Sequence, residues 1–192
     1  MLSKEEIAFF MLEDASSQRK INAKAGQRYY EGEHDILNYR LFYYDADGEL
    51  QEDKTRSNIK ISHPFFTELV DQQAQYMLNG DKFVKSDDPV LQDELDKVFN
   101  DDFTSELTET LKDAAVNGFG YMYCFKTADD VFKFESADGM GVVEVRAKDT
   151  DDNCEYVIYW YIDKNTKANK KIKRIQVWDK ERIYFYTQSE DG

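Results

Sequence analysis

The stretch LKDAAVNGFGYMYCF, residues 111–125, marks the point at which the chain changes its type of secondary structure. Small and apolar residues lead to the pair Asn117–Gly118, which ends a helix because glycine tolerates the left-handed conformation of a C-terminal cap. Directly after Gly120, Tyr121–Phe125 is a compact aromatic run that is typical of a strand. The sequence therefore predicts helices before this point and strands after it.

The clearest helical pattern before this point covers residues 59–78. Ser62 or His63 can cap it, Pro64 fits its first turn, and the pair Asn79–Gly80 ends it. The side chains that recur near the helical period are Phe66, Leu69, Val70, Gln73, Tyr76 and Met77. We expect this helix to pack on the sheet that begins near Tyr121 and to bury Phe66, Leu69, Val70 and Met77 there.

Further helices are expected on both sides of this one. Ile7, Phe10 and Met11 begin an amphipathic helix, and residues 16–28 contain good helix formers with Gly26 as a weak point. Two helices follow residue 80, one with Leu91, Leu95, Val98 and Phe99, the other running from Phe103 to Ala115. Residues 39–44, turning at Asp47–Gly48, predict a small hairpin arm.

Short strand patterns fill the rest of the chain, at residues 131–135, 142–146, 156–162, 172–178 and 183–186. Acidic turns separate them, at Asp129–Asp130, Asp138–Gly139 and residues 163–167, as in an antiparallel meander. Helices followed by strands predict an α+β fold, with amino-terminal helices before an antiparallel β-sheet. We divide the chain into a helical arm of residues 1–57 and an α+β domain of residues 58–192, with helices over 59–118 and strands over 120–187.

Composition excludes several classes of protein. Hydrophobic residues make up 41% and aromatic residues 15% of the 192 positions, which is too apolar for a disordered chain. A net charge of −14 disfavours tight nonspecific binding of nucleic acid and anionic membranes. The apolar runs are shorter than a membrane span, and Lys4–Glu6 do not begin a signal peptide. We expect an intracellular soluble protein.

Residues suited to catalysis or metal binding do not form a recognisable set. His34 and His63 lack a second ligand at metal spacing, so structural hydrogen bonding is the favoured interpretation of His34 and capping or packing that of His63. Cys124 and Cys154 fit neither a zinc pattern nor an activated nucleophile, and no glycine-rich phosphate loop is present. We therefore predict no catalytic residue, no cofactor and no required metal.

One segment begins like a calcium loop. Asp149, Asp151 and Asn153 match its first three ligand positions, but Cys154 occupies the glycine position and Trp160 that of the bidentate glutamate. A solvated turn is the favoured interpretation, and adventitious cation binding is the alternative.

Charge is unevenly distributed along the chain. Residues 87–113 carry ten acidic residues against Lys97 and Lys112, a net charge of −8, and residues 164–182 have a net charge of +6. Two interpretations stay open: solvated faces, or complementary surfaces that meet between neighbouring subunits. For the second, the candidate interface residues are Asp93, Glu94, Asp96, Lys170, Lys171 and Lys173.

Three segments, in this order and spacing, resemble the amino-terminal part of tailed-bacteriophage portal proteins of the siphophage type found in Gram-positive hosts. The first is Tyr29–Leu37, where the family has a Tyr-Tyr-x-Gly-x-His-x-Ile pattern. The second runs from Asn58–Ile61 to a Val-Asp-Gln core and Leu78–Gly80, and the third is the stretch before Tyr121. The residues that carry the resemblance are Tyr29, Tyr30, Gly32, His34, Val70, Asp71, Gln72, Gly80, Gly118 and Gly120.

This resemblance implies a structural role. Portal subunits form a homo-oligomeric ring at one vertex of the phage head, through which DNA is packaged and later ejected. The chain would be a truncated wing region without stem and crown, and DNA would pass through the ring without specific binding by this region. Capsid, terminase and head–tail connector proteins would be its partners, and assembly would take place in the cytoplasm of the bacterial host.

An acidic protein-binding module, such as a DNA mimic, is the alternative function. The net charge of −14 allows it, because a mimic needs carboxylates arranged like phosphates. The basic segment 164–182 interrupts such a surface. An enzyme of unknown type ranks third.

Overall fold

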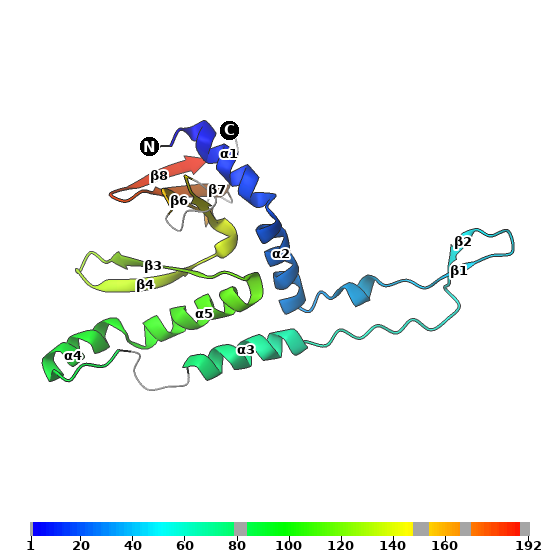
Figure 1. The fold of residues 1–192 in the computed structure, drawn as a ribbon, viewed down its shortest axis with the longest axis horizontal. Coiled ribbons are helices and arrows are strands. Elements are labelled where there is room, and N and C mark those ends of the chain that lie inside the picture. Colours follow the sequence, from blue (N-terminus) through cyan, green and yellow to red (C-terminus); the bar gives the residue numbers. More distant parts are fainter. Residues whose placement is uncertain (1, 79–83, 148–153, 166–169, 189–192) are drawn as a thin grey trace.

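The computed structural model describes residues 2–78, 84–147, 154–165 and 170–188. Within them the helices come first and the strands follow, so the predicted α+β fold is confirmed. Figure 1 shows a body of helices and sheets from which one long arm projects. The partial calcium loop of Asp149, Asp151 and Asn153 lies outside the described residues, as does Gly80.

Four of the helices begin, and the longest one ends, where the sequence supplies a capping residue. The side chains of Ser3, Ser17, Asp88 and Asn100 each accept a hydrogen bond from a backbone N–H of the first turn that follows. Gly118, with φ of 79°, provides the left-handed C-terminal cap of the longest helix. The α-helices are α1 (Lys4–Ala15), α2 (Gln18–Tyr30), α3 (Phe65–Leu78), α4 (Pro89–Val98) and α5 (Asp101–Asn117), with 3-10 turns η1 (Asp35–Asn38) and η2 (Gly139–Gly141).

The strands pair in three antiparallel sheets. Two are hairpins, β1 (Phe42–Tyr44) with β2 (Leu50–Glu52) and β3 (Tyr121–Lys126) with β4 (Phe132–Ala137). The third is a meander in the order β5 (Val142–Val145), β6 (Tyr156–Asn165), β7 (Lys170–Trp178) and β8 (Ile183–Gln188). The predicted meander is thus present, with β3–β4 as a separate hairpin and β1–β2 as the predicted arm hairpin.

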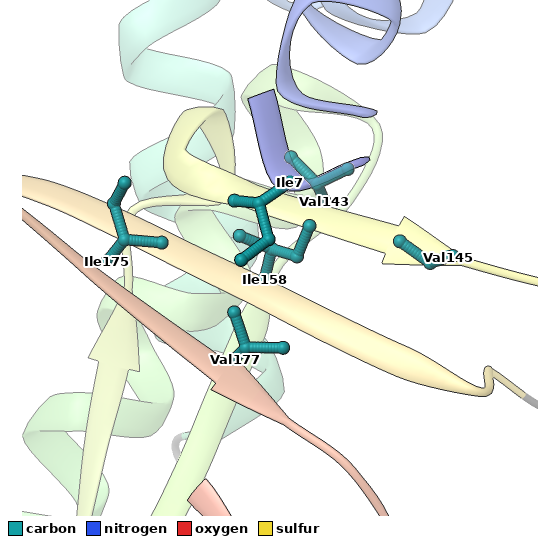
Figure 2. Packing of buried hydrophobic residues seen from close by; sticks show 6 residues of the cluster. All are labelled: Ile7, Val143, Val145, Ile158, Ile175 and Val177. Atoms are coloured by element: carbon teal, nitrogen blue, oxygen red, sulfur yellow. The ribbon is translucent and has the colours of Figure 1, made fainter. Parts of the chain in front are cut away.

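The main hydrophobic core lies between α1 and one face of the meander. Ile7 of α1 packs on the buried side chains shown in Figure 2, which are Val143, Val145, Ile158, Ile175 and Val177. Ile158 is fully buried, at 0% exposure. On the other face, Tyr123 of β3 lies 6.3 Å from Tyr159 and 6.1 Å from Trp178, measured between ring centroids. β3 thus contacts this second face near Tyr159 and Trp178, while Phe185 of β8 on the same face is 72% exposed.

A buried lysine joins α2 to the start of the meander. The Lys20 ammonium donates to the carbonyl oxygens of Gly139 and Val142, the second at 2.8 Å, and lies 3.3 Å from the Asp14 carboxylate. Burial lowers the pKa of Lys20, and Asp14 opposes that shift. The amino-terminal helices are thus packed with the later part of the chain, and the boundary at residue 57 stays a prediction.

The predicted helix over residues 59–78 was wrong in its start and in its buried face. α3 begins at Phe65, and the hydroxyl of Ser62 interacts with Gly32 and His34 instead of capping α3. Val70 is buried as expected and Phe66 is half-buried, but Leu69 is 50% and Met77 56% exposed. The buried stripe runs through Val70 and Ala74, because the small Ala74 lets α3 approach its neighbours closely.

The neighbours of α3 are also other than expected. It packs on α5 and α2, and it is α5 that packs on β3 and β4. α5 therefore separates the two layers that we predicted to be in contact. In the described part of the chain, no helix is long and apolar enough to cross a membrane.

A fully buried side chain, Ile158, and an exposed one, Leu69, provide a test of this packing. Ile158→Ala should lower the free energy of unfolding by about 2–5 kcal/mol, because it removes fully buried methyl groups and leaves a cavity. Leu69→Ala should change it by less than about 0.5 kcal/mol, as at an ordinary surface position. Urea melts of both variants measure the difference. A loss for Leu69→Ala equal to that for Ile158→Ala would contradict the observed face of α3.

Candidate functional site

Family-like residues of the first two segments, Tyr29, Tyr30, Gly32, His34 and Asp71, meet at one junction between α2 and α3, whereas Gly118 and Gly120 of the third segment lie at the end of α5. The Tyr30 hydroxyl donates to Asp71 Oδ1 over 2.9 Å, and the Thr67 hydroxyl donates to the Tyr30 carbonyl oxygen over 2.6 Å. Burial, followed by the hydrogen bond to Asp71, raises the pKa of Tyr30. Tyr30 therefore stays a neutral donor that holds α2 and α3 together.

The second part of this junction surrounds Gly32, which adopts the left-handed region with φ of 81°. The Ser62 hydroxyl lies 2.7 Å from the Gly32 carbonyl oxygen and 3.2 Å from His34 Nδ1. His34 Nε2 lies 3.2 Å from the Tyr29 carbonyl oxygen, to which it donates, since a carbonyl only accepts. These contacts agree with the hydrogen-bonding role expected for His34.

Tyr29 and Asp35 fix the point at which the chain leaves α2. The Tyr29 hydroxyl donates to Asp35 Oδ2 over 2.9 Å, and Arg28 Nη2 lies 2.7 Å from Asp35 Oδ1. The hydrogen bond from Tyr29 and the charge of Arg28 lower the pKa of Asp35. The Tyr29 ring also lies 5.0 Å from the His34 ring, between centroids.

The junction extends from α3 to α5 through Asp71. Lys112 Nζ lies 3.3 Å from Asp71 Oδ1 and 3.7 Å from Glu109 Oε1. Val70, which precedes Asp71 in the sequence, is buried, whereas Gln72, which follows it, is exposed. Within the Val-Asp-Gln core, Val70 thus contributes to packing, Asp71 accepts a hydrogen bond and Gln72 lies at the surface.

Two glycines permit close backbone approach at α5. A Cβ at Gly120 would lie 2.3 Å from the Thr110 carbonyl oxygen, and one at Gly26 would lie 2.0 Å from the Val116 carbonyl oxygen. Gly120 belongs to the family-like residues, but the sequence indicated Gly26 only as a weak point of a helix. Its role as the crossing point of α2 and α5 depends on a contact 90 positions away in the chain, and local patterns carry no signal for it.

The charged candidate surfaces lie far apart in a single subunit. α4, with Asp93, Glu94 and Asp96, and β7, with the basic candidates, occupy different parts of the fold (Figure 1). They are therefore not in contact with each other within one chain. We define these as the acidic surface, α4 and α5, and the basic surface, β7.

The charged side chains of these two surfaces differ in their exposure and in the contacts that they already make. Asp93 and Glu94 are exposed, with Glu94 Oε1 2.6 Å from Lys97 Nζ, while Asp96 accepts a hydrogen bond from Gln92 over 2.7 Å. Lys171 is exposed. Lys173 is half-buried with its Nζ 4.3 Å from the centroid of the Trp160 ring, and burial lowers its pKa. The side chain of Lys170 lies outside the described residues.

Among the described side chains, no three of His, Cys, Asp and Glu are grouped so that they could hold a metal ion. The contacts above join α2, α3 and α5 to one another and to the segment that follows α2. Comparison with known proteins agrees: the family described as phage portal protein, SPP1 Gp6-like, matches residues 11–192. The chain belongs to this family of phage portal proteins, which are structural proteins, and the resemblance seen in the sequence is confirmed.

A particular relative can also be named. The portal protein of Bacillus phage SPP1 is 27% identical to this chain over 161 residues, which cover 84% of the chain and 32% of the relative. The chain thus spans about a third of the length of the curated relative that it matches.

The crossing of α2 and α5 gives a prediction with an unusual sign. Gly26→Ala should improve helix propensity by about 1 kcal/mol, yet we expect a net loss of about 1–3 kcal/mol from overpacking against Val116. The matched control is Ala25→Gly at the exposed neighbouring position, which should lose about 1 kcal/mol through propensity alone. Thermal or urea unfolding compares them. A stabilised Gly26→Ala protein would mean that α2 and α5 do not approach this closely.

Proposed function

We propose that this chain is the wing-like part of a portal-ring subunit, in a ring through which phage DNA is packaged and ejected. The family match over residues 11–192 is the observation that carries the proposal. The protein would sit at the portal vertex of the virion, after assembly in the cytoplasm of the host. It would perform no catalysis.

The partners follow from the same proposal. The ring would be built from copies of the full-length protein, and its neighbours would be capsid, terminase and head–tail connector proteins. With a net charge of −14, this region would let DNA pass without binding it specifically. The acidic surface and the basic surface are the proposed contact between adjacent subunits, with Asp93, Glu94 and Asp96 facing Lys170, Lys171 and Lys173.

Assembly state tests the proposed function. The full-length protein that contains this chain should form closed rings in electron micrographs. The 192-residue chain should sediment as a monomer or a weakly associating species. The matched region is only 32% of the relative, and the remaining part of such a protein can supply further head-to-tail contacts. A full-length protein that stays monomeric would contradict the portal function. A tight dimer of the short chain that binds a nucleic-acid enzyme would instead favour the DNA mimic.

The charged contact has its own test in the full-length protein. Lys171→Glu should slow ring formation at low ionic strength, and the effect should fade as salt screens the charges. Lys180→Glu, an exposed position in the β7–β8 turn, is the matched control for the change in net charge. Light scattering follows the rate. Equal rates for both variants and for the unmodified protein at all salt concentrations would remove the charge-pairing idea.

A further inference from the structure

Residues 35–61 form an arm that leaves the body between α2 and α3 and carries the β1–β2 hairpin near its end (Figure 1). The outgoing limb starts directly after His34, and the returning limb ends at Ser62, shortly before α3. The Ser62 hydroxyl contacts both Gly32 and His34, so one polar group links the two ends of the arm. The number of hydrogen bonds in this link depends on the protons that His34 carries.

The two nitrogens of His34 face different kinds of group. Nε2 lies 3.2 Å from the Tyr29 carbonyl oxygen, so this contact is a hydrogen bond only if Nε2 carries a proton. Nδ1 lies 3.2 Å from Ser62 Oγ, which belongs to a hydroxyl with one proton and two lone pairs. The same Oγ lies closer, at 2.7 Å, to the Gly32 carbonyl oxygen, which can only accept. The Ser62 proton is therefore directed to Gly32, and Oγ turns a lone pair toward Nδ1.

Neither neutral form of the His34 ring satisfies all three contacts. With the ring proton on Nε2, the single hydroxyl proton serves either Gly32 or Nδ1, and the other contact brings two lone pairs together. With the ring proton on Nδ1, the Nε2 lone pair faces the Tyr29 carbonyl oxygen. The imidazolium donates at both nitrogens, to Ser62 and to Tyr29, while Ser62 donates to Gly32. The geometry at the base of the arm thus fits the charged ring.

The charged groups nearest to His34 come from α2 and η1 and form a pair of their own. Arg28 Nη2 lies 2.7 Å from Asp35 Oδ1, and the Tyr29 hydroxyl donates to Asp35 Oδ2. Asp35 favours a positive charge on His34 and Arg28 opposes it, so their effects on the ring largely offset each other. The other titratable residues close to it in the sequence, Glu31, Glu33 and His63, are exposed. The hydrogen bonds of the ring therefore decide which protonation state this arrangement favours.

We propose that His34 is a pH-sensitive latch at the base of the arm. When the ring is protonated, all three contacts are hydrogen bonds, and the arm is held in the direction seen in Figure 1. When the ring loses its proton, one contact becomes repulsive, and the returning limb at Ser62 separates from the turn at Gly32. The direction of the arm, and with it the position of the exposed Phe42 and Tyr44 of its hairpin, then depends on pH.

Nuclear magnetic resonance of the ¹⁵N-labelled 192-residue chain tests the latch between about pH 5 and 8, where histidine changes its charge. The chain has two histidines, so the single variant His63→Gln assigns the imidazole signals of His34. We expect a proton on both His34 nitrogens at the low end of this range. Hydrogen-exchange protection factors of the bonded N–H groups of Gly32, Glu33 and Leu37 should be about two- to tenfold higher there, the effect of one hydrogen bond. Both changes should follow the same titration curve.

Substitutions at Ser62 distinguish a latch from a contact that is merely structural. Ser62→Ala should give low protection at every pH and move the titration of His34 to lower pH, because the charged ring loses an acceptor. Ser62→Thr keeps the hydroxyl and should keep the pH dependence, as should His63→Gln, with circular dichroism confirming that each variant is folded. The proposal would be overturned by protection that stays constant while His34 titrates in the unmodified chain. The same pH dependence in Ser62→Ala, or an unprotonated Nδ1 at the low end of the range, would also overturn it.

Discussion

One buried ammonium group organises the body of this subunit. Lys20 is almost completely buried, and a charge there is tolerated because two carbonyl oxygens and the Asp14 carboxylate surround it. Those oxygens belong to the η2 turn and to the first residue of β5, so the lysine fixes α2 at the entrance of the meander. From that position α1 reaches the sheet with Ile7, and α2 crosses α5 at Gly26.

Much of the fold could be predicted because local chemistry determines it. Gly118 ends α5 as expected from its position after Asn117, and the strands from residue 121 onward follow the aromatic and β-branched runs. The face of α3 was mispredicted for a different reason. Leu69 and Met77 are large, and large residues dominate a periodic pattern, whereas the small Ala74 at the actual contact adds little to it. A pattern weighted by large apolar side chains therefore indicates the wrong face where two helices cross closely, because a close crossing requires small residues.

In the candidate site, too, the residue types could be recognised from the sequence, whereas their contacts with distant parts of the chain could not. The family-like residues were recognised as a set, yet the sequence did not show that Tyr30 and Asp71 would be hydrogen-bonded to each other. Neither did it show the burial of Lys20, whose carbonyl partners lie more than 100 positions away. A lysine in a polar helical stretch normally extends into water, and only the placement of η2 and β5 makes it a buried donor. For the acidic and basic surfaces, sequence predicted the charge but not the burial of Lys173 against Trp160.

The core that joins Ile7 to Val177 also determines when α1 can reach its native position during synthesis. α1 leaves the ribosome before the sheet that covers it, and that sheet is complete only when β8 has emerged. During that interval the apolar face of α1 has no native partner, while α2, α3 and α5 can already associate with one another. α1 is thus synthesised before the sheet on which it packs, and it reaches its final place only after that sheet has formed.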